Sequence, residues 1–452
     1  MRLRKTITTI VATAILLAGW QLFAVIANQP ELIPSLPRLV RTLCEWLVSG
    51  SFYQSVGATI FRGILGMSIS FVCAIGMAGL FARFEWVYEL FRPLLAIMRS
   101  IPVISFILLA LIFLNPESIP LMIAFLTMFP LLTENLTRGI LDLRPGLSIM
   151  ARQFHIKRSN VLFQIIYPQL KPFLYSGLAS AAGFGWRAII MGEVLSQCAF
   201  GIGSEMKRAQ NFIAVPELLA WTIVAVFISF FFDKGISKVA DITPKISFAN
   251  EDQTIPTPTL SVLDTKDISY QYGIQHFSHS FQKGIIYGIS APSGKGKTTL
   301  LNLIGGILLP TEGEIHPTRH FGIATIFQQP QLLPHLTAEE NIILPLSSFL
   351  TEEKARRIAQ KHLQEMEMEP FGNRYPKELS YGQQQRIAIA RALASPSPLL
   401  LMDEPFKGLD EALSHRIIER IREKQMKEER IILFTSHNPD EIRLLADEVI
   451  YL

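Results

Sequence analysis

The 452-residue chain is 49% hydrophobic and only 18% charged, whereas soluble globular domains carry roughly a quarter charged residues. A single ordinary globular domain is therefore excluded, and the length allows about two to four domains. The formal net charge of +4 is too small to indicate a nucleic-acid-binding surface. Cys44, Cys73 and Cys198 are too few and too scattered for a disulfide framework or a zinc site.

Charge and hydropathy divide the chain near residue 250. Residues 1–250 carry 21 Lys+Arg and 12 Asp+Glu, whereas residues 251–452 carry 21 and 26. The first half is therefore net +9 and the second net −5, and the basic half holds the long apolar runs. Residues 241–260 are polar, contain three prolines and lack periodicity. We predict a transmembrane domain over residues 1–240, a linker over residues 241–260 and a second domain over residues 261–452.

The first half contains apolar segments long enough to cross a bilayer. A membrane-spanning helix needs about 20 mostly apolar residues, because lipid offers no partner to unpaired backbone groups. The first segment could instead be a cleaved signal peptide, but its apolar run of about 21 residues exceeds the usual 7 to 15 or so and favours a retained span. We predict an all-α domain with six spans near residues 7–27, 60–81, 93–114, 118–136, 173–197 and 215–233.

Basic residues in the loops predict the orientation. With the N-terminus inside, eleven Lys and Arg residues fall in inner segments and four in outer segments, as the positive-inside rule requires. An even number of spans returns the chain to the cytoplasm before the second domain. We expect a multi-pass protein of the cell (inner) membrane whose second domain is cytoplasmic.

The longest inner segment, near residues 137–172, mixes apolar and basic side chains. It fits a helix that lies on anionic lipid and equally a short helix that docks on a cytoplasmic domain. The sequence leaves both interpretations open.

Charge is costly inside a membrane span, and the ionisable residues that stand out within the predicted spans are Arg62, Arg99, Glu134, Arg187 and Glu193. Arg187 and Glu193 lie deepest, in the fifth span, after small residues at 176–185 that allow helices to approach closely. We therefore expect this span to line a pathway across the membrane. Arg187 near such a pathway would fit an anion, but we expect it to pair with Glu193 or Glu134.

A phosphate-binding loop is the strongest local motif. Residues 288–299 (GISAPSGKGKTT) follow a short β-branched run and lead into the apolar run LLNLIGGIL. A strand, a glycine-containing loop and a helix start place backbone N–H groups around phosphates, with Lys297 at the β- and γ-phosphates and Thr298 at Mg²⁺. Ala291 replaces the first glycine of the usual pattern. The predicted nucleotide-binding residues are Ala291, Pro292, Ser293, Gly294, Lys295, Gly296, Lys297, Thr298 and Thr299.

About a hundred residues later, an apolar run at 399–402 ends in Asp403 and Glu404. A continuous apolar run is typical of a strand buried on both faces. At its end Asp403 would complete the Mg²⁺ shell, and Glu404 would orient or deprotonate the attacking water.

Residues 262–452 resemble the ATPase domain of ABC transporters, because further motifs occur in the order typical of that family. The stretch LSYGQ at 379–383, followed by QQRIAIARAL, resembles the signature, with Tyr381 where the family usually has glycine. Phe327–Gln328 resembles the Q-loop, KGLD the D-loop and FTSHNPDE the switch region. The resemblance implies an α/β P-loop NTPase fold with ATP and Mg²⁺ as cofactors.

The same resemblance implies roles for individual residues. Gln328 would sense the γ-phosphate and join the Mg²⁺ site, and His437 and Gln328 would act with Glu404 in catalysis. Asp410 would belong to the D-loop. Tyr272 fits the aromatic residue that stacks on adenine, with Tyr270 and simple strand packing as alternatives. The signature residues that would cap the ATP of the opposite subunit are Ser380, Gly382 and Gln383.

Residues 35–235 are similar to permeases of the nitrate/sulfonate/taurine type of ABC importer. The stretches that carry the similarity are LPRLVRTL, FRPLLAIMRSIPV, IIYPQLKPFLYSGLASAAGFGW and MGEVL. In that family the loop after the fourth span forms a coupling helix, and residues 149–155 occupy its place without the usual Glu and Gly. The following Ile166-Tyr167-Pro168 fits the family.

Together these features predict an ATP hydrolase that drives import of a small solute as a permease–ATPase fusion. The resemblance implies a homodimer, because each ABC site uses the phosphate loop of one subunit and the signature of another. It also implies a separate extracytoplasmic solute-binding protein, and no nucleic acid is expected. The solute would be a nitrate-, sulfonate- or taurine-like anion or a vitamin precursor. The alternatives are an ABC exporter and an ATP-driven mechanical or signalling complex, but neither long cytoplasmic helix extensions nor a sizeable outer domain is predicted.

Overall fold

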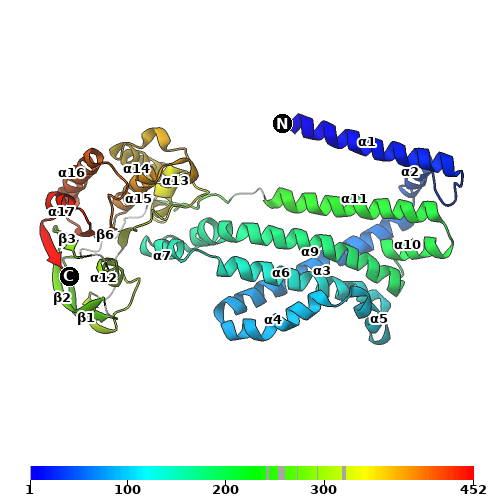
Figure 1. The fold of residues 1–452 in the computed structure, drawn as a ribbon, viewed down its shortest axis with the longest axis horizontal. Coiled ribbons are helices and arrows are strands. Elements are labelled where there is room, and N and C mark those ends of the chain that lie inside the picture. Colours follow the sequence, from blue (N-terminus) through cyan, green and yellow to red (C-terminus); the bar gives the residue numbers. More distant parts are fainter. Residues whose placement is uncertain (1, 241–243, 253–259, 272, 293, 318–321) are drawn as a thin grey trace. The chain divides into compact units, whose positions relative to one another are not determined.

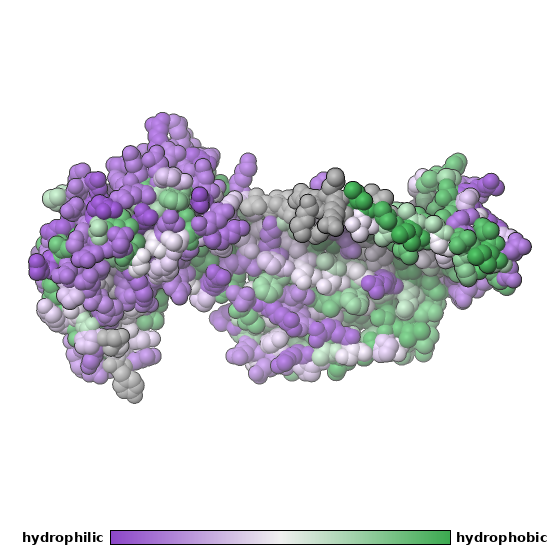
Figure 2. Space-filling model, turned by 45° about the horizontal axis from the view of Figure 1, so that its top comes forward, coloured by the Kyte–Doolittle hydropathy of each residue, from purple (hydrophilic) through white to green (hydrophobic). Residues whose placement is uncertain are grey.

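The computed structural model describes residues 2–240, 244–252, 260–271, 273–292, 294–317 and 322–452. The chain forms two compact units. The helical unit comprises Met1–Leu143 and Gln169–Thr243, and the α/β unit comprises Arg144–Pro168 and Pro244–Leu452. Apolar side chains cover much of the helical unit on the face drawn in Figure 2, whereas the α/β unit shows mainly polar side chains there.

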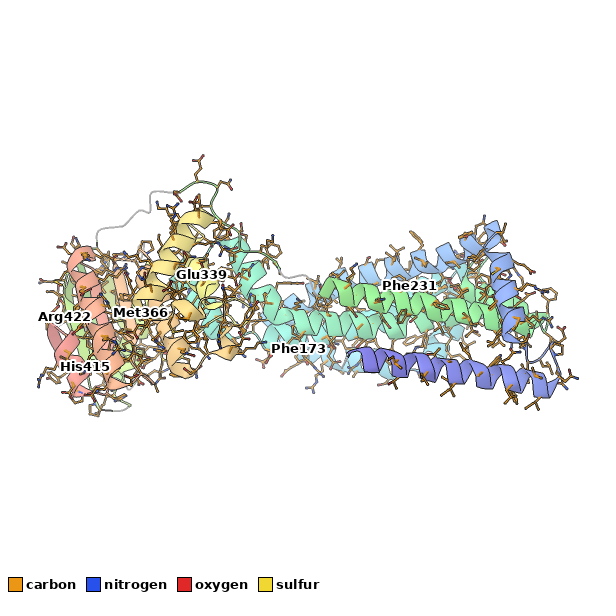
Figure 3. The ribbon with its side chains drawn as sticks, turned by 90° about the horizontal axis from the view of Figure 1, so that it is seen from above. Phe173, Phe231, Glu339, Met366, His415 and Arg422 are labelled. Carbon is orange, nitrogen blue, oxygen red and sulfur yellow. The ribbon has the colours of Figure 1, made fainter. Side chains whose placement is uncertain are left out.

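The helical unit is built from long helices joined by short turns (Figure 1). Its elements are α1 (Arg2–Ala27), α2 (Leu36–Trp46), α3 (Gly50–Arg83), α4 (Glu85–Ser100), α5 (Val103–Phe113), η1 (Pro116–Ser118), α6 (Ile119–Leu141), α9 (Tyr167–Ser196), α10 (Ile202–Asn211) and α11 (Val215–Ala240). Phe173 lies on α9 and Phe231 on α11 (Figure 3).

Four helical stretches among the described residues are long and apolar enough to cross a membrane: Gly50–Arg83, Pro116–Leu141, Arg158–Ser196 and Val215–Ala240. They overlap the second, fourth, fifth and sixth predicted spans. The first predicted span lies in α1, whose apolar stretch Val11–Ala27 is shorter than this length criterion.

The third predicted span, residues 93–114, is corrected by the structure. It is not one helix, because α4 and α5 meet at an angle of 95°. Ile101 is extended, with φ −72° and ψ 130°, since the ring of Pro102 disfavours the helical conformation for the residue before it. Pro102 also has no N–H with which to continue the helix.

Small residues bring α3, α6 and α9 close together. On α3 the buried face carries Thr59, Gly63, Gly66 and Ser70, among other small residues. A Cβ on Gly66 would lie 2.6 Å from the Cβ of Ala124 on α6. Close backbone approach through small side chains is how helices associate in lipid, where the hydrophobic effect does not drive them together.

The predicted stretch of small residues at 176–185 takes part in this packing. A Cβ on Gly177 would lie 3.0 Å from the Cβ of Asn135, and one on Gly185 would lie 2.5 Å from the Cγ of Met128. Both of these neighbours belong to α6, so this part of α9 packs directly against α6.

The α/β unit contains two sheets. The five-stranded sheet has the order β5-β6-β7-β3-β8 and all its pairs are parallel, whereas the three-stranded sheet, β2-β1-β4, is antiparallel. The strands are β1 (Val262–Tyr270), β2 (Ile274–Gln282), β3 (Ile286–Ser290), β4 (Glu312–His316), β5 (Ile323–Ile326), β6 (Leu399–Asp403), β7 (Ile431–Thr435) and β8 (Glu448–Tyr451). All residues of β6 and β7 are buried, as expected for a parallel sheet covered on both faces.

Helices pack on these sheets, and three short helical elements from between the fourth and fifth predicted spans belong to the same unit. The helical elements of the α/β unit are α7 (Pro145–Gln153), α8 (Arg158–Asn160), η2 (Val161–Ile166), α12 (Lys297–Ile304), α13 (Ala338–Leu346), α14 (Glu352–Glu365), η3 (Glu369–Phe371), η4 (Pro376–Glu378), α15 (Tyr381–Ala394), α16 (Glu411–Glu428) and α17 (Pro439–Leu445). In Figure 3, Glu339 marks the start of α13 and His415 lies on α16.

Gly203→Ala is expected to destabilise the helical unit. A Cβ at Gly203 on α10 would lie 2.3 Å from the carbonyl oxygen of Ile190 and 2.9 Å from the backbone nitrogen of Val194. Because backbone atoms cannot swing away, we expect a cost of about 1–3 kcal/mol. Thermal unfolding in detergent micelles should show a lower Tm. Gly183→Ala on α9 is the control, since its Cβ meets nothing within 4 Å; equal Tm values for the two variants would contradict the packing described for α10.

Candidate nucleotide-binding site

The phosphate loop connects β3 to α12 and requires its glycines. Gly296 is the N-cap of α12 with φ 90°, and a Cβ there would lie 2.7 Å from the carbonyl oxygen of Gly273. Gly294 has φ 82°. Ala291, in contrast, is not among the described residues with positive φ. The position where the motif usually has glycine therefore accepts alanine without backbone strain.

Lys297 folds back over this loop. It is 7% exposed, its Nζ donates to the carbonyl oxygen of Ala291 at 2.7 Å, and the same Nζ lies 3.4 Å from Nδ1 of His437. The structure thus brings the predicted phosphate lysine and the predicted switch histidine to one place, although they are 140 residues apart in sequence.

Thr298, Asp403 and Thr435 form a cluster of oxygen atoms beside the loop. The hydroxyl of Thr298 donates to Asp403 Oδ2 at 2.9 Å, and that of Thr435 donates to Asp403 Oδ1 at 2.8 Å. Burial raises the pKa of Asp403, while these two hydrogen bonds oppose the rise. Hydroxyl and carboxylate oxygens are the ligands that Mg²⁺ prefers, so Thr298 and Asp403 fit the predicted Mg²⁺ site.

Glu404 contacts three side chains. Two of them are distant in sequence, and the third follows it by three residues across a turn. Its Oε1 accepts a hydrogen bond from Gln328 Nε2 at 3.1 Å and lies 3.2 Å from His437 Nε2. Its Oε2 lies 3.0 Å from Lys407 Nζ. Burial would raise the pKa of Glu404, but Lys407, with help from His437 and Gln328, holds that pKa below its ordinary value. The three predicted catalytic residues therefore meet at one carboxylate.

The contact between Glu404 and Lys407 was missed by the sequence analysis. Glu404 has φ 47°, a left-handed conformation that turns the chain sharply after β6 and brings Lys407 back toward it. A basic residue three positions after the carboxylate, in EPFKGLD, was the available signal.

The signature residues act as helix caps within this chain. Ser380 is the N-cap of α15 and forms a capping box with Gln383, and a Cβ on Gly382 would lie 2.6 Å from the carbonyl oxygen of Gly408. Asp410 caps α16 by accepting a hydrogen bond from the backbone N–H of Leu413. Within the described ranges, no hydrogen bond or ion pair joins these residues to the phosphate loop of the same chain.

Tyr381 joins the signature to the Q-loop. Its hydroxyl donates to the carbonyl oxygen of Gln328 at 2.7 Å, and burial raises its pKa. The side chain that departs from the family pattern thus contacts the backbone of a predicted catalytic residue.

The remaining predicted residues are placed as follows. Tyr272 and Ser293 lie outside the described residues. Tyr270 is partly buried against the core that includes β1 and β3, which is the packing role considered for it. In the loop, the backbone N–H of Lys295 donates to the carbonyl oxygen of Pro292, and Thr299 lies in α12.

Residues 144–168 pack into the core of the α/β unit. Leu147, Met150, Phe154 and Ile165 share one buried cluster with residues of α13, α15 and β6. Of the two interpretations that the sequence left open, this packing favours docking on the second domain over a position on lipid.

Polar side chains hold residues 144–168 in place on the rest of the α/β unit by hydrogen bonds. Asn160 Nδ2 donates to the carbonyl oxygen of Ser247 and to Ser347 Oγ, both at 2.8 Å, and Asn160 Oδ1 accepts from the backbone N–H of Ser247 at 2.8 Å. Gln153 Nε2 donates to the carbonyl oxygen of Gly305 at 2.7 Å. These uncharged residues of an inner loop gave no sequence signal.

Arg391 links the docked segment to the Q-loop. It is fully buried on α15, and burial lowers its pKa to about 10. It donates to the carbonyl oxygens of Pro330 at 2.9 Å and Gln331 at 2.8 Å. Its guanidinium carbon also lies 5.3 Å from the centre of the Phe154 ring, within the range of a cation–π contact.

Comparisons with known proteins match both halves of the chain. The family described as ABC transporter matches residues 274–407, and that described as binding-protein-dependent transport system inner membrane component matches residues 66–233. An uncharacterized ABC transporter ATP-binding protein of Methanocaldococcus jannaschii is 34% identical over 201 residues, 40% of this chain and 85% of that protein. The chain belongs to the ABC transporter family and joins a permease domain to an ABC ATPase domain.

Other curated relatives have names that specify import. A thiamine import ATP-binding protein of Yersinia pseudotuberculosis is 34% identical over 42% of this chain and 86% of its own length. An Fe(3+) ions import ATP-binding protein of Rhizobium etli is 35% identical over 40% of this chain. The chain spans about half the length of the first curated relatives that it matches, 54% and 52%.

Asn160→Ala is expected to loosen the contact between residues 144–168 and the rest of the α/β unit. The substitution removes the partner of the half-buried backbone groups of Ser247 and of the buried Ser347 hydroxyl, and an unsatisfied buried group costs about 1–3 kcal/mol. Hydrogen exchange of the Ser247 amide should therefore accelerate by about tenfold or more. Asn373→Ala, at an exposed position of the same unit, is the control. Unchanged exchange over residues 244–248 would contradict the docking role of Asn160.

Proposed function

We propose that the chain is a half-transporter that hydrolyses ATP to import a small solute across the cell (inner) membrane. The observation that carries this proposal is the meeting of Gln328, His437 and Lys407 at Glu404, next to the cluster of Thr298 and Asp403. A structural carboxylate at the end of a strand would not need three converging polar partners. A carboxylate that handles the proton of an attacking water does need to be held in one orientation.

In this mechanism each side chain has a defined task. The backbone N–H groups of the phosphate loop and Lys297 would bind the phosphates. Thr298 and Asp403 would hold Mg²⁺, which would supply positive charge to the phosphates. Glu404 accepts the proton of the attacking water. His437 and Gln328 orient Glu404, and Gln328 reports on the γ-phosphate.

The placement of the signature supports a homodimer. Ser380, Gly382, Gln383 and Asp410 contact their own helices rather than their own phosphate loop, which supports an arrangement in which they cap the ATP of a second copy. Two ATP molecules would then lie between two chains.

Coupling to the permease would run through the Q-loop and residues 144–168. A shift at Gln328 is transmitted to Pro330 and Gln331, whose carbonyl oxygens bind Arg391, and from Arg391 to Phe154. Such a chain of packed and hydrogen-bonded groups is a physical route for a two-state change.

The direction and the partner are inferred from the family of the permease domain. A binding-protein-dependent permease supports import with a separate extracytoplasmic solute-binding protein, and the import-specific names of the relatives favour this over an exporter or a mechanical complex. The solute class is that of the resembling permeases, a nitrate-, sulfonate- or taurine-like anion or a vitamin precursor.

Glu404→Gln is expected to leave ATP binding intact and to slow hydrolysis by about 10²–10⁴-fold, the contribution of a general base. The reconstituted chain would be assayed for phosphate release and, separately, for nucleotide binding. Glu419→Gln on the exposed face of α16 is the matched control. Undiminished hydrolysis by Glu404→Gln would refute this mechanism.

Lys407→Ala is expected to move the acid limb of the ATPase pH profile to higher pH. Lys407 holds the pKa of Glu404 down, so its removal raises that pKa and more Glu404 is protonated at a given acidic pH. Activity should fall on the acid side and change little where Glu404 remains ionised. Lys407→Arg keeps the charge and should keep the profile; a shift of the same size in both variants would show that Lys407 acts by another route.

A further inference from the structure

A cavity lies at the break between α4 and α5. Its volume is about 430 Å³, and α6 and α9 complete its wall. Cavities of about 300–1,000 Å³ are typical of small-molecule sites. Discontinuous helices near the middle of the membrane are also where transporters place bound solutes.

Two arginines line this cavity, and one of them has no acidic partner among the described residues. Arg99 pairs with Glu134, which also binds Arg138. Glu193 pairs with Arg62 at 2.8 Å and accepts hydrogen bonds from Thr59.

The expected pairing of Arg187 with Glu193 or Glu134 is therefore wrong. Residues six positions apart on a helix point to different faces, and Glu193 accordingly points to α3. Within the part of the chain that the structure describes, Arg187 forms no ion pair, and its guanidinium carbon lies 5.7 Å from the centre of the Phe184 ring.

The depth of Arg187 makes this exposed charge significant. It lies nine residues before Ser196, the last residue of α9, which is about 13 Å at 1.5 Å per residue. The bilayer core is about 30 Å thick, so a span that ends at Ser196 places Arg187 near the middle of that core. A guanidinium at that depth is costly unless it faces water or an anion.

The lining suits an organic anion better than an inorganic one. Arg99 and Arg187 supply the positive charge, and no Asp or Glu is among the described lining residues. Ser100 and Thr127 donate their hydroxyl protons to their own helices. Most of the remaining wall is apolar, with Met98, Phe184 and Met191 among its side chains, and the volume exceeds that of an ion such as nitrate several-fold.

We propose that this cavity is a solute-selecting site inside the membrane domain, which binds a small organic anion with its sulfonate or carboxylate group at Arg187 and Arg99. The anion's apolar part lies against Phe184 and Met191. This inference rests on the proposed import function and places part of the solute selection in the permease itself, in addition to any separate binding protein.

The test uses the full-length chain in lipid nanodiscs and titrates three probes of similar size by calorimetry: benzenesulfonate, benzyl alcohol and benzyltrimethylammonium. We expect benzenesulfonate to bind at least tenfold more tightly than either of the others. Arg187→Gln should reduce the affinity for benzenesulfonate at least tenfold, and Arg187→Lys should restore most of it. Arg83→Gln is the matched control, because Arg83 also stacks on a neighbouring ring, that of Phe84 at 5.1 Å, but does not line the cavity. ATP binding by each variant checks that the α/β unit is folded.

Several outcomes would contradict the proposed anion-binding site. Equal affinity for the three probes would show an apolar cavity without anion selection, and undiminished benzenesulfonate binding by Arg187→Gln would show that the anion binds elsewhere. Loss of dimers in Arg187→Gln with unchanged anion binding would assign Arg187 to a contact with a second copy. Failure of the proposed function is distinguishable, because it would appear as absent ATP turnover in a wild-type chain that still binds benzenesulfonate selectively.

Discussion

The buried guanidinium of Arg391 connects the Q-loop to residues 144–168, the segment that follows the fourth predicted span in sequence and packs into the α/β unit. Its charge is enclosed completely, and burial lowers its pKa to about 10, so it remains protonated at neutral pH and must be compensated. The compensation comes from the carbonyl oxygens of Pro330 and Gln331 and from the face of the Phe154 ring. Among the described residues, no carboxylate pairs with it. A movement of the Q-loop backbone would therefore remove both hydrogen-bond acceptors from a buried charge unless Arg391 moved with the loop, and Phe154 packs on Arg391. This constraint is the physical basis of the proposed coupling.

Glu404, the proposed catalytic base, has a different kind of environment. Glu404 is not enclosed, and its partners are cationic or polar groups from three places in the sequence. Lys407 and His437 keep Glu404 ionised, whereas burial keeps the pKa of its neighbour Asp403 raised. Two adjacent carboxylates thus differ in environment, and the proposed division of labour between cation binding and proton transfer follows from that difference.

The sequence predicted what depends on contiguous residues. The phosphate loop, the strand that ends in Asp403 and Glu404, and four apolar spans each occupy one stretch of chain. The sequence did not predict features that depend on a bend of the backbone or on partners distant in sequence. Hydropathy over residues 93–114 does not reveal the 95° bend at Ile101 and Pro102. Asn160 could not be recognised as a docking residue, because its partner Ser347 lies 187 positions away. The Lys407 contact depends on the left-handed conformation of Glu404.

In the membrane domain, the neighbours of each ionisable side chain indicate what its charge does. The ionisable residues Arg62, Arg99, Glu134, Arg187 and Glu193 in the predicted spans cannot be distinguished by composition. The structure separates them, because Arg62, Glu193 and Thr59 form a closed network that ties α3 to α9, and Arg99 and Glu134 form another between α4 and α6. A paired charge in lipid stabilises helix packing, but Glu134 is shared between Arg99 and Arg138, so this group keeps a net positive charge that an anion can use. Arg187 differs from the others because, among the described residues, its neighbour is a ring and not a carboxylate. No acidic side chain in the described part of the chain offsets the free energy of placing Arg187 in the membrane, so the proposed anion in the adjacent cavity is the partner that offsets it with the least rearrangement.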